Sequence, residues 1–340
     1  IERAGVHSGD SMAVYPPVSL SVEVQREMVL NACRIARALG VHGLMNIQFV
    51  VAPDKTGKLR PYVLEVNPRA SRTVPYLSKV TGIPMVDLAT RCMMGQQLSE
   101  LGYEGGLWVL DPKSVREAAK AGPCPPYAGG RIIPESEFIA GIPTFPEPIL
   151  YAVKAPVFSF QKLARVEPSL GPEMKSTGEI LGIDFRYEAA LYKALVASGI
   201  HFREHGDVVL TVNDADKPKA VEVAREIVAA GIPIIATSGT ANALRDAGIR
   251  CRDAAKIQEG SPNLLDLIAS GEVSLMINTP HVGRQASDES ARIRRACIES
   301  GVPCVTNIDT AGALARAIRL YADPKATECR RLEEYLTGQT

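Results

Sequence analysis

The chain has 340 residues, of which 46% are hydrophobic, and these values predict a globular protein with about two domains and sizeable cores. Its 38 basic and 38 acidic residues leave no net charge, which argues against binding to nucleic acid or to a polyanionic membrane surface. No apolar run approaches the length that spans a bilayer. We therefore expect small-molecule chemistry, with no nucleic-acid and no membrane partner.

Cysteine usage and the first residues give two further expectations. The seven cysteines include no close pair of the metal-knuckle or redox type, and their number is odd, so we expect a reducing, cytoplasmic location. They are Cys33, Cys92, Cys124, Cys251, Cys297, Cys304 and Cys329. Residues 1–5 contain neither an initiator methionine nor the apolar core of a signal peptide, which indicates a piece of a longer protein.

The first predicted element follows a polar loop at residues 5–11. Ser21 is a favourable helix N-cap, apolar residues then recur at helical spacing from Val24 to Leu39, and Gly40 is a typical stop. The pattern therefore predicts a helix over residues 21–39, and we expect it to pack under the next two strands.

Those two strands cover residues 44–51 and the segment that ends at residues 64–67. Because side chains alternate along a strand, polar residues of each segment share one face, and Leu64 and Val66 are predicted to face the core. The turn-rich residues 53–58 lie between them. This arrangement predicts an antiparallel hairpin.

The polar face of this hairpin carries candidate metal ligands. Antiparallel pairing would bring Gln48 beside Glu65 and Asn67, and carboxylate and amide oxygens suit Mg²⁺ or Mn²⁺ together with nucleotide phosphates. Arg69 and Arg72 follow directly and could neutralise charge on a transferred phosphoryl group. From spacing alone, a solvated salt-bridge network explains the cluster equally well.

The middle of the chain is less regular. Residues 84–97 have the apolar spacing of a helix, whereas residues 98–148 are rich in Pro and Gly and are predicted to form a polar surface loop. A strand is predicted at Tyr151–Phe158.

From residue 201 onward, apolar strands alternate with helices, which predicts a doubly wound parallel sheet. The predicted strands are 208–212, 234–237, 275–278 and 304–306, and the predicted helices are 217–230, 240–247, 263–270, 288–300 and 310–320. Residues 237–240, Thr-Ser-Gly-Thr, follow one strand and open a helix, where backbone N–H groups attract anions. A simple capped helix start is the alternative interpretation.

Several segments, taken in order, resemble the second ATP-grasp unit of the carbamoyl-phosphate synthase large subunit. They are residues 5–11 (GVHSGDS), 43–49 (GLMNIQF), 65–69 (EVNPR), 78–84 (SKVTGIP) and 170–179 (LGPEMKSTGE). The resemblance implies that ATP is bound by Gly5, Val6, His7, Ser8, Gln48 and Glu65. It also implies that Gln48, Glu65 and Asn67 hold Mg²⁺ or Mn²⁺, and that Arg69 and Arg72 face the phosphoryl and carbamate groups as catalytic residues.

The last part resembles the methylglyoxal-synthase-like (MGS-like) allosteric domain of the same subunit. The resemblance implies an effector site at Lys217, Thr237, Thr240, Lys256 and Asn278. Pro280 stands where the family has a threonine, so UMP, IMP and a ligand of another class such as N-acetylglutamate stay open. The retained Lys256 and the turn at 237–240 favour a phosphorylated nucleotide.

These patterns combine into three expected domains. Residues 1–97 are expected to form an ATP-grasp lobe that is incomplete at its N-terminus, residues 98–199 an insertion and connection, and residues 200–340 the allosteric domain. The resemblance implies glutamine-hydrolysing carbamoyl-phosphate synthesis for pyrimidine and arginine biosynthesis, with this chain inactive on its own. The implied partners are a glutaminase small subunit and the rest of the large subunit, in a homo-oligomer of heterodimers. The alternative is an effector-binding and oligomerising module without catalysis.

Overall fold

The computed structural model describes residues 4–103, 105–111, 130–145, 150–160, 170–200, 206–279 and 288–318, with 328, 330, 334 and 335. The chain divides into two compact units. One comprises Val14–Ala152 with Arg330–Thr340, and we call it the hairpin unit. The other comprises Ile1–Ala13 with Val153–Cys329, and we call it the parallel-sheet unit.

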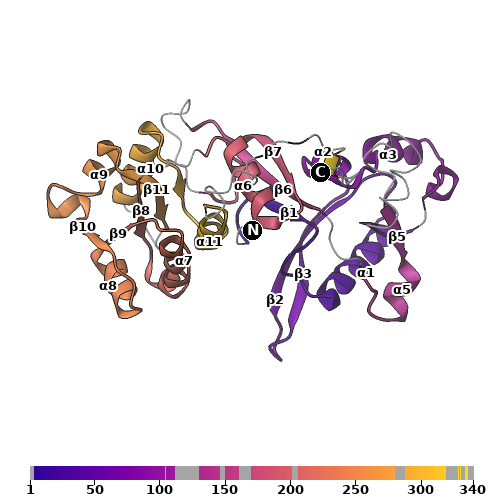
Figure 1. Ribbon diagram of the computed structural model, residues 1–340. Coiled ribbons are helices and arrows are strands. Elements are labelled where there is room, and N and C mark those ends of the chain that lie inside the picture. Colours follow the sequence, from indigo (N-terminus) through magenta and orange to yellow (C-terminus); the bar gives the residue numbers. More distant parts are fainter. Residues whose placement is uncertain are drawn as a thin grey trace. The chain divides into compact units, whose positions relative to one another are not determined.

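The hairpin unit contains two antiparallel strand pairs, β2 with β3 and β4 with β5, one helix of 17 residues and several shorter helices (Figure 1). Its elements are α1 (Val22–Ala38), β2 (Asn46–Pro53), β3 (Leu59–Asn67), α2 (Thr73–Thr81), α3 (Met85–Met93), η1 (Leu98–Leu101), β4 (Gly106–Leu110), β5 (Gly130–Pro134) and α5 (Glu135–Ala140).

The first predicted helix is confirmed as α1. The Ser21 hydroxyl accepts a hydrogen bond from the backbone N–H of Val24 at 3.4 Å, so it caps the helix as expected. Gly40, just past the end, has a φ of 58°, a left-handed conformation that favours glycine. The helix packs against β3, and Glu27 pairs with Arg60 of that strand at 2.8 Å. The hairpin therefore packs against α1.

The predicted core face of β3 was wrong. Leu64 is 59% exposed, and the two residues before it are exposed as well. The ladder also contains a bulge: Gln48 pairs with Glu65, and the next residue, Phe49, pairs with Val63. Leu64 is thus the extra residue, and the simple alternation of faces ends there. A strict two-residue period cannot anticipate such an insertion.

Residues 98–148 were predicted as a polar loop, and this was also wrong for the part that the structure describes. Strands β4 and β5 pair there, with Trp108 opposite Ile132, and α5 follows. The strands are short and lie 20 residues apart in the sequence, so local patterns do not reveal their pairing. Helix α3 is shorter than predicted and ends at Met93, before Gly95, which has a φ of 100°. Helix α2 was not predicted.

The parallel-sheet unit contains a five-stranded sheet and most of a three-stranded sheet, β1–β6–β7. The boundaries between the two units fall within β1 and within β6, so each of these strands has residues in both units. Its elements are β1 (Ala13–Tyr15), β6 (Tyr151–Phe158), β7 (Ser176–Asp184), α6 (Tyr187–Ala197), β8 (Asp207–Thr211), η3 (Asp214–Asp216), α7 (Lys217–Ala229), β9 (Ile234–Thr237), α8 (Ser238–Asp246), β10 (Arg252–Ala254), η4 (Ile257–Glu259), α9 (Leu264–Ser270), β11 (Val273–Asn278), α10 (Asp288–Glu299), β12 (Cys304–Val305) and α11 (Ile308–Ile318).

The five-stranded sheet confirms the predicted doubly wound architecture. All of its pairings are parallel, in the order β10–β9–β8–β11–β12. Figure 1 shows α9 and α10 on one side of this sheet and α7, α8 and α11 on the other. Strand β10 was not predicted, because it has only three residues and two of them are charged. The predicted strand Tyr151–Phe158 is confirmed as β6.

The core of this unit lies between the sheet and its helices. One cluster joins side chains of four strands, including Val209, Ile235 and Met276, to side chains of α9 and α10. Cys297 and Cys304 also pack in this cluster, although their spacing in the sequence did not indicate that they are neighbours. A hydrogen bond with Cys304, together with burial, raises the pKa of the Cys297 thiol. Among the described residues, no helix is both long and apolar enough to cross a bilayer.

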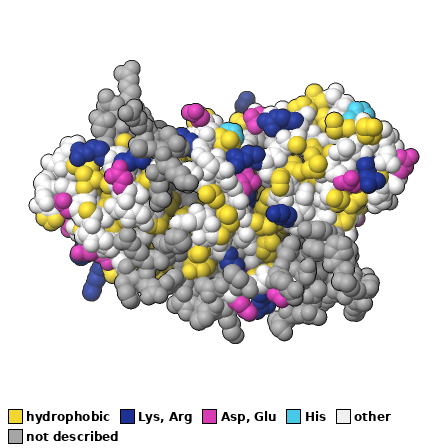
Figure 2. Space-filling model, turned by 90° about the horizontal axis from the view of Figure 1, so that it is seen from above, with side chains coloured by type: hydrophobic (Ala, Val, Ile, Leu, Met, Phe, Trp, Pro, Cys, Tyr) yellow, Lys and Arg dark blue, Asp and Glu magenta, His cyan; other side chains and the backbone are white. Residues whose placement is uncertain are grey.

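Figure 2 displays one face of the molecule, on which Lys and Arg side chains are interspersed with Asp and Glu. This mixture agrees with the absence of net charge in the sequence.

Candidate functional site

The polar face of the hairpin forms as the sequence predicts. Gln48 lies directly opposite Glu65 in the antiparallel ladder, and Asn46 lies opposite Asn67. Opposite residues of an antiparallel pair project to the same side, so these four side chains share one face of the hairpin. The amide nitrogen Nδ2 of Asn67 donates to Oε1 of Glu65 at 2.8 Å. The structure therefore brings the three predicted metal ligands together.

The chemistry of these three side chains fits a hard divalent cation. Gln48 and Asn67 are half-buried and Glu65 is exposed, so their oxygens are open to a ligand from solvent. The set contains one carboxylate, and no cluster of three or more His, Cys, Asp or Glu suited to a metal occurs in the described part of the chain. Mg²⁺ commonly uses one or two carboxylates and completes its shell with substrate phosphates and water. The hairpin therefore fits a cation that arrives with a nucleotide.

The two predicted catalytic arginines follow the end of β3. The backbone turns there, with the N–H of Arg69 donating to the carbonyl of Asn67 at 2.8 Å. The guanidinium of Arg69 donates to the carbonyl of Ala70 at 3.0 Å and remains exposed. Arg72 is exposed and occupies the N-cap position of α2. Both positive charges thus lie close in the chain to the acidic and amide ligands.

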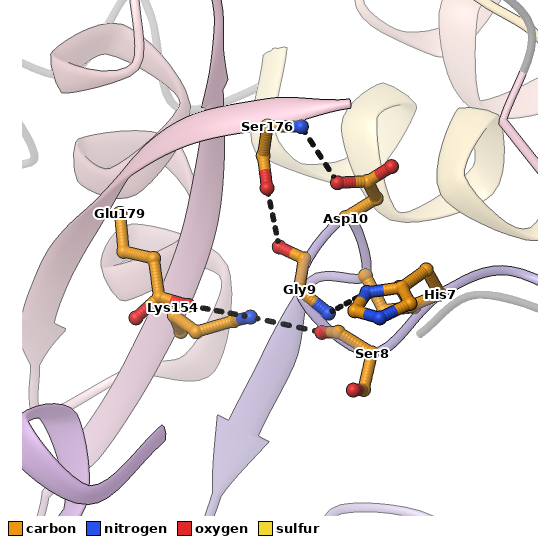
Figure 3. A network of polar contacts seen from close by, with 8 residues as sticks. His7, Ser8, Gly9, Asp10, Lys154, Ser176 and Glu179 are labelled. Atoms are coloured by element: carbon orange, nitrogen blue, oxygen red, sulfur yellow. Dashed lines mark hydrogen bonds and ion pairs between the residues drawn. The ribbon is translucent and has the colours of Figure 1, made fainter. Parts of the chain in front are cut away.

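The predicted nucleotide loop, residues 5–11, belongs to the parallel-sheet unit. Figure 3 shows the ring of His7 beside the backbone of Gly9, whose N–H donates to Nδ1 of His7 at 3.0 Å. This contact is the local, turn-forming interaction that an isolated histidine would have. With Nδ1 as the acceptor, the neutral ring carries its proton on Nε2. His7 therefore shapes the loop with one nitrogen and has a donor on the other.

Asp10 fixes the end of this loop and was not among the predicted site residues. Its carboxylate is fully buried and accepts the backbone N–H groups of Lys175 and Ser176, both at 2.8 Å. The N–H of His7 donates to the carbonyl of Gly171 at 2.8 Å. The segment 170–179 thus holds the loop through Gly171, Lys175 and Ser176.

The carboxyl ends of the parallel strands form a second candidate site. The sheet register puts Thr211 opposite Asn278, and Thr237 opposite Ala254, at the same edge. Thr237 and Asn278 are buried, and the hydroxyl of Thr237 donates to that of Thr211 at 3.2 Å. Ligands of parallel sheets bind at this edge.

The predicted phosphate turn lies at this edge. Thr240 is buried, and its hydroxyl accepts the backbone N–H of Val212 at 3.2 Å. The ammonium of Lys217 lies 3.6 Å from the position that a Cβ on Gly239 would occupy, at the start of α8. Lys217 also pairs with Asp214 at 2.7 Å. The structure therefore places a cation beside a helix N-terminus, and both features favour phosphate binding.

The other two predicted effector residues have different settings. Lys256 is exposed and lies two residues beyond the end of β10, at the N-cap position of η4. Asn278 accepts a hydrogen bond at Oδ1 from Nη1 of Arg294 at 2.9 Å. Arg294 is fully buried, and sequence reasoning missed it because it lies on α10, 16 residues away from Asn278. Pro280 lies outside the described residues.

A polar network beside Asn278 was also missed. The hydroxyl of buried Thr279 accepts the N–H of Asn213 at 3.0 Å, and the amide of Asn213 donates to Asp216 at 2.7 Å. A threonine and an asparagine after strand ends give no specific signal in a single sequence. They fix the loop between β8 and α7, and hence Lys217.

A cavity of about 340 Å³ lies within the parallel-sheet unit. Its lining includes Asp10, Leu195, Arg294, Cys304 and Thr310. The cavity therefore adjoins both the end of the nucleotide loop and the helix that carries Arg294.

Comparison with known proteins gives two matches to sequence families. The carbamoyl-phosphate synthase L chain, ATP binding domain, matches residues 2–101, and the MGS-like domain matches residues 219–306. Among solved structures, one described as "Crystal structure of ForH" is 19% identical over 40% of this chain and 96% of that chain. Its TM-score to this chain is 0.24. The chain thus contains an ATP-binding domain of the carbamoyl-phosphate synthase L chain followed by an MGS-like domain, the order found in the C-terminal part of that enzyme's large subunit.

Proposed function

We propose that this chain acts as the C-terminal part of the large subunit of glutamine-hydrolysing carbamoyl-phosphate synthase, and that its ATP-binding domain phosphorylates carbamate. The observation that carries the proposal is the hairpin register, which puts Gln48 opposite Glu65 while Asn67 donates to the same carboxylate. The family match to an ATP-binding domain over residues 2–101 supports ATP as the phosphoryl donor.

In this proposal, the hairpin binds and orients the nucleotide phosphates. Mg²⁺ or Mn²⁺, held by Gln48, Glu65 and Asn67, would neutralise phosphate charge. The hydrogen bond from Asn67 orients the Glu65 carboxylate, and Gln48 contributes a neutral amide oxygen from the opposite strand. Holding the phosphoryl donor in one position favours in-line attack by carbamate.

The remaining roles fall to the loop and the arginines. Gly5, Val6, His7 and Ser8 would line the nucleotide, with Nε2 of His7 as a hydrogen-bond donor. Arg69 and Arg72 would stabilise negative charge on the phosphoryl oxygens and on carbamate, as guanidinium groups do in other phosphoryl transfers. Their exposure is compatible with binding a substrate that comes from solution.

The MGS-like domain would provide allosteric control by a phosphorylated nucleotide, UMP or IMP. The support is the ammonium of Lys217 beside Gly239 at the start of α8, together with buried Thr237 and Thr240. Lys256 and Asn278 would complete the contacts. N-acetylglutamate is the alternative effector, because a helix N-terminus also binds carboxylates.

The wider assignment follows from the same proposal. A glutaminase small subunit would supply ammonia, the rest of the large subunit would complete the ATP site, and the complex would assemble as an oligomer of heterodimers in the cytoplasm. Carbamoyl phosphate would serve pyrimidine and arginine biosynthesis.

The test is glutamine-dependent carbamoyl-phosphate synthesis by the complete large subunit with its glutaminase partner. Glu65→Ala should reduce synthesis by several orders of magnitude at saturating Mg²⁺, because a metal carboxylate contributes several kcal/mol to the transition state. Glu27→Gln, which alters the exposed ion pair between α1 and Arg60 of β3, is the matched control and should stay near the wild type. Near-normal synthesis by Glu65→Ala would contradict the proposal.

A second candidate is an effector-binding and oligomerising module without catalysis. The observation in its favour is that the carboxyl-edge site is built wholly within the parallel-sheet unit, whereas the residues proposed for ATP are divided between the two units. Nucleotide binding with no synthesis by the complete wild-type complex would favour this candidate.

A further inference from the structure

Lys154 is a buried lysine that the proposed mechanism does not use. It lies on β6, and the whole residue is 1% exposed, which makes it one of the largest fully buried side chains among the described residues. Burying an ammonium group is costly unless other groups compensate its charge and accept its hydrogen bonds. A hydrophobic residue of similar size would avoid that cost, so the lysine is expected to have a specific task.

Two of its contacts identify that task. The ammonium lies 3.4 Å from Oε1 of Glu179 on the neighbouring strand β7, and it donates to the backbone carbonyl of Ser8 at 3.1 Å. Figure 3 shows the side chain reaching from β6 to the loop, with the Ser8 hydroxyl pointing away from the ammonium. Glu179 supplies the compensating charge, and the shorter contact is the one to Ser8.

The next two residues of the loop are held from the other side. The hydroxyl of Ser176 donates to the carbonyl of Gly9 at 3.1 Å, and Asp10 accepts two backbone N–H groups at the start of β7. A Cβ on Gly9 would lie 2.8 Å from Sδ of Met174, so no side chain fits there without a shift. These hydrogen bonds fix the loop backbone at Gly9 and Asp10, and the hydrogen bond from Lys154 fixes the preceding peptide, that of Ser8.

We propose that Lys154 is a positioning residue for the nucleotide, acting through the Ser8 peptide, which it holds so that His7 and Ser8 face the ligand. This inference rests on the proposed function, because that function makes residues 5–8 the nucleotide loop. Fixing a binding loop before the ligand arrives removes an ordering cost from binding. Its loss weakens nucleotide binding, whereas the chemical step, which depends on other residues, is little affected.

The test uses the complete large subunit and the formation of ATP from ADP and carbamoyl phosphate, the reverse of the proposed phosphorylation. Lys154→Met fills the same space without the charge or the hydrogen bond. It should raise the KM for ADP about ten- to a hundredfold, as expected for a lost charge-assisted hydrogen bond, and change kcat by less than about threefold. Lys193→Met is the matched control, because Lys193 lies on α6 in the same unit and pairs with Asp184 of β7 at 2.8 Å.

A second variant keeps the test decisive if Lys154→Met does not fold. Glu179→Gln keeps the shape and an acceptor oxygen but removes the charge that orients the ammonium, so the KM for ADP should rise by a smaller factor, about three- to tenfold. Circular dichroism and thermal unfolding establish that each variant is folded. An unchanged KM in the folded variants, or a fall in kcat with unchanged KM, would overturn the positioning role.

The failure of the proposed function is distinguishable from this outcome. If the wild-type subunit forms no ATP, the carbamate-phosphorylation proposal fails, and calorimetry of ADP binding then tests Lys154 directly. Weaker ADP binding by Lys154→Met than by the wild type and Lys193→Met supports the positioning role. Equal affinity in the three proteins overturns it.

Discussion

Gln48 and Glu65 lie directly opposite each other in the antiparallel pair of β2 and β3, one position before the bulge that interrupts the ladder. This register puts an amide and a carboxylate on the same side of the hairpin, and Asn67 adds a hydrogen bond to the carboxylate at 2.8 Å. A shift of the β2–β3 pairing register by one residue would make the side chains of Gln48 and Glu65 project to opposite faces of the hairpin. The bulge therefore lies outside the pairs that carry the proposed metal ligands.

The first prediction concerns the weaker ligand. Gln48→Leu removes a neutral oxygen but leaves the carboxylate, so carbamoyl-phosphate synthesis in the complete complex should fall about ten- to a hundredfold, less than for Glu65→Ala. Higher Mg²⁺ should restore part of the activity. A steady-state Mg²⁺ titration measures this; equal loss in the two variants, with no response to Mg²⁺, would contradict a graded metal site.

The second prediction concerns the effector. Lys217→Ala should weaken UMP or IMP binding about ten- to a hundredfold, because it removes the cation beside the start of α8. Synthesis without effector should be unchanged, since the two sites communicate only through a coupling free energy. Calorimetry measures the binding.

Lys219→Ala is its matched control, because Lys219 lies two residues along α7 and pairs with Asp309 in an exposed position. Equal effector affinity in the Lys217 and Lys219 variants would place the phosphate elsewhere.

The third prediction tests the phosphate turn as a structural element. Thr240→Val leaves the buried N–H of Val212 without its acceptor and should cost about 1–3 kcal/mol of unfolding free energy. Thr240→Ser keeps the oxygen and loses one methyl group, for a cost of about 0.8 kcal/mol. Urea unfolding and hydrogen exchange of the Val212 amide measure both, and equal protection of that amide in the two variants would count against the hydrogen bond.

The fourth prediction is a pH dependence in the hairpin unit. Tyr76 is buried and donates to the carbonyl of Ala152 at 2.8 Å, and burial, with a smaller effect of Tyr15, raises the pKa of its phenol above the ordinary value of 10.0. Above pH 10 the unfolded chain therefore releases a proton that the folded chain retains, so stability falls as the pH rises. Below pH 10 this contribution is fully present.

Tyr76→Phe removes that titration. It should cost about 1 kcal/mol at pH 8 through the lost hydrogen bond, and it should flatten the loss of stability between about pH 10 and 11.5. Urea unfolding as a function of pH measures both effects. The same alkaline slope in the wild type and the variant would show that Tyr76 does not control it.

Periodic patterns in the sequence were sufficient to predict the parallel sheet and the hairpin. The apolar strands of the last domain and the N-cap at Ser21 are local signals, and the hairpin turn sets which residues face each other. The bulge at Leu64 and the pairing of β4 with β5 were not predictable, because both depend on contacts that local spacing does not encode.

The residues of the candidate sites likewise fall into two groups, those predictable from local spacing and those that depend on the tertiary fold. Gln48, Glu65 and Asn67 could be grouped from strand alternation, since they lie on two adjacent strands. Arg294 could not, because only the fold of α10 brings it to Asn278. Lys154 appeared in the sequence as an ordinary residue of a strand, and its burial and its contact with Ser8 are tertiary properties.

The most direct test of the account is the location of Mn²⁺ in a crystal of the complete large subunit grown with Mn²⁺ and a non-hydrolysable ATP analogue. We predict an anomalous-scattering peak about 2.0–2.3 Å from side-chain oxygens of Gln48, Glu65 and Asn67 and in contact with the analogue's phosphates. A Mn²⁺–nucleotide complex bound at full occupancy elsewhere, with these three side chains making no contact to it, would contradict the account.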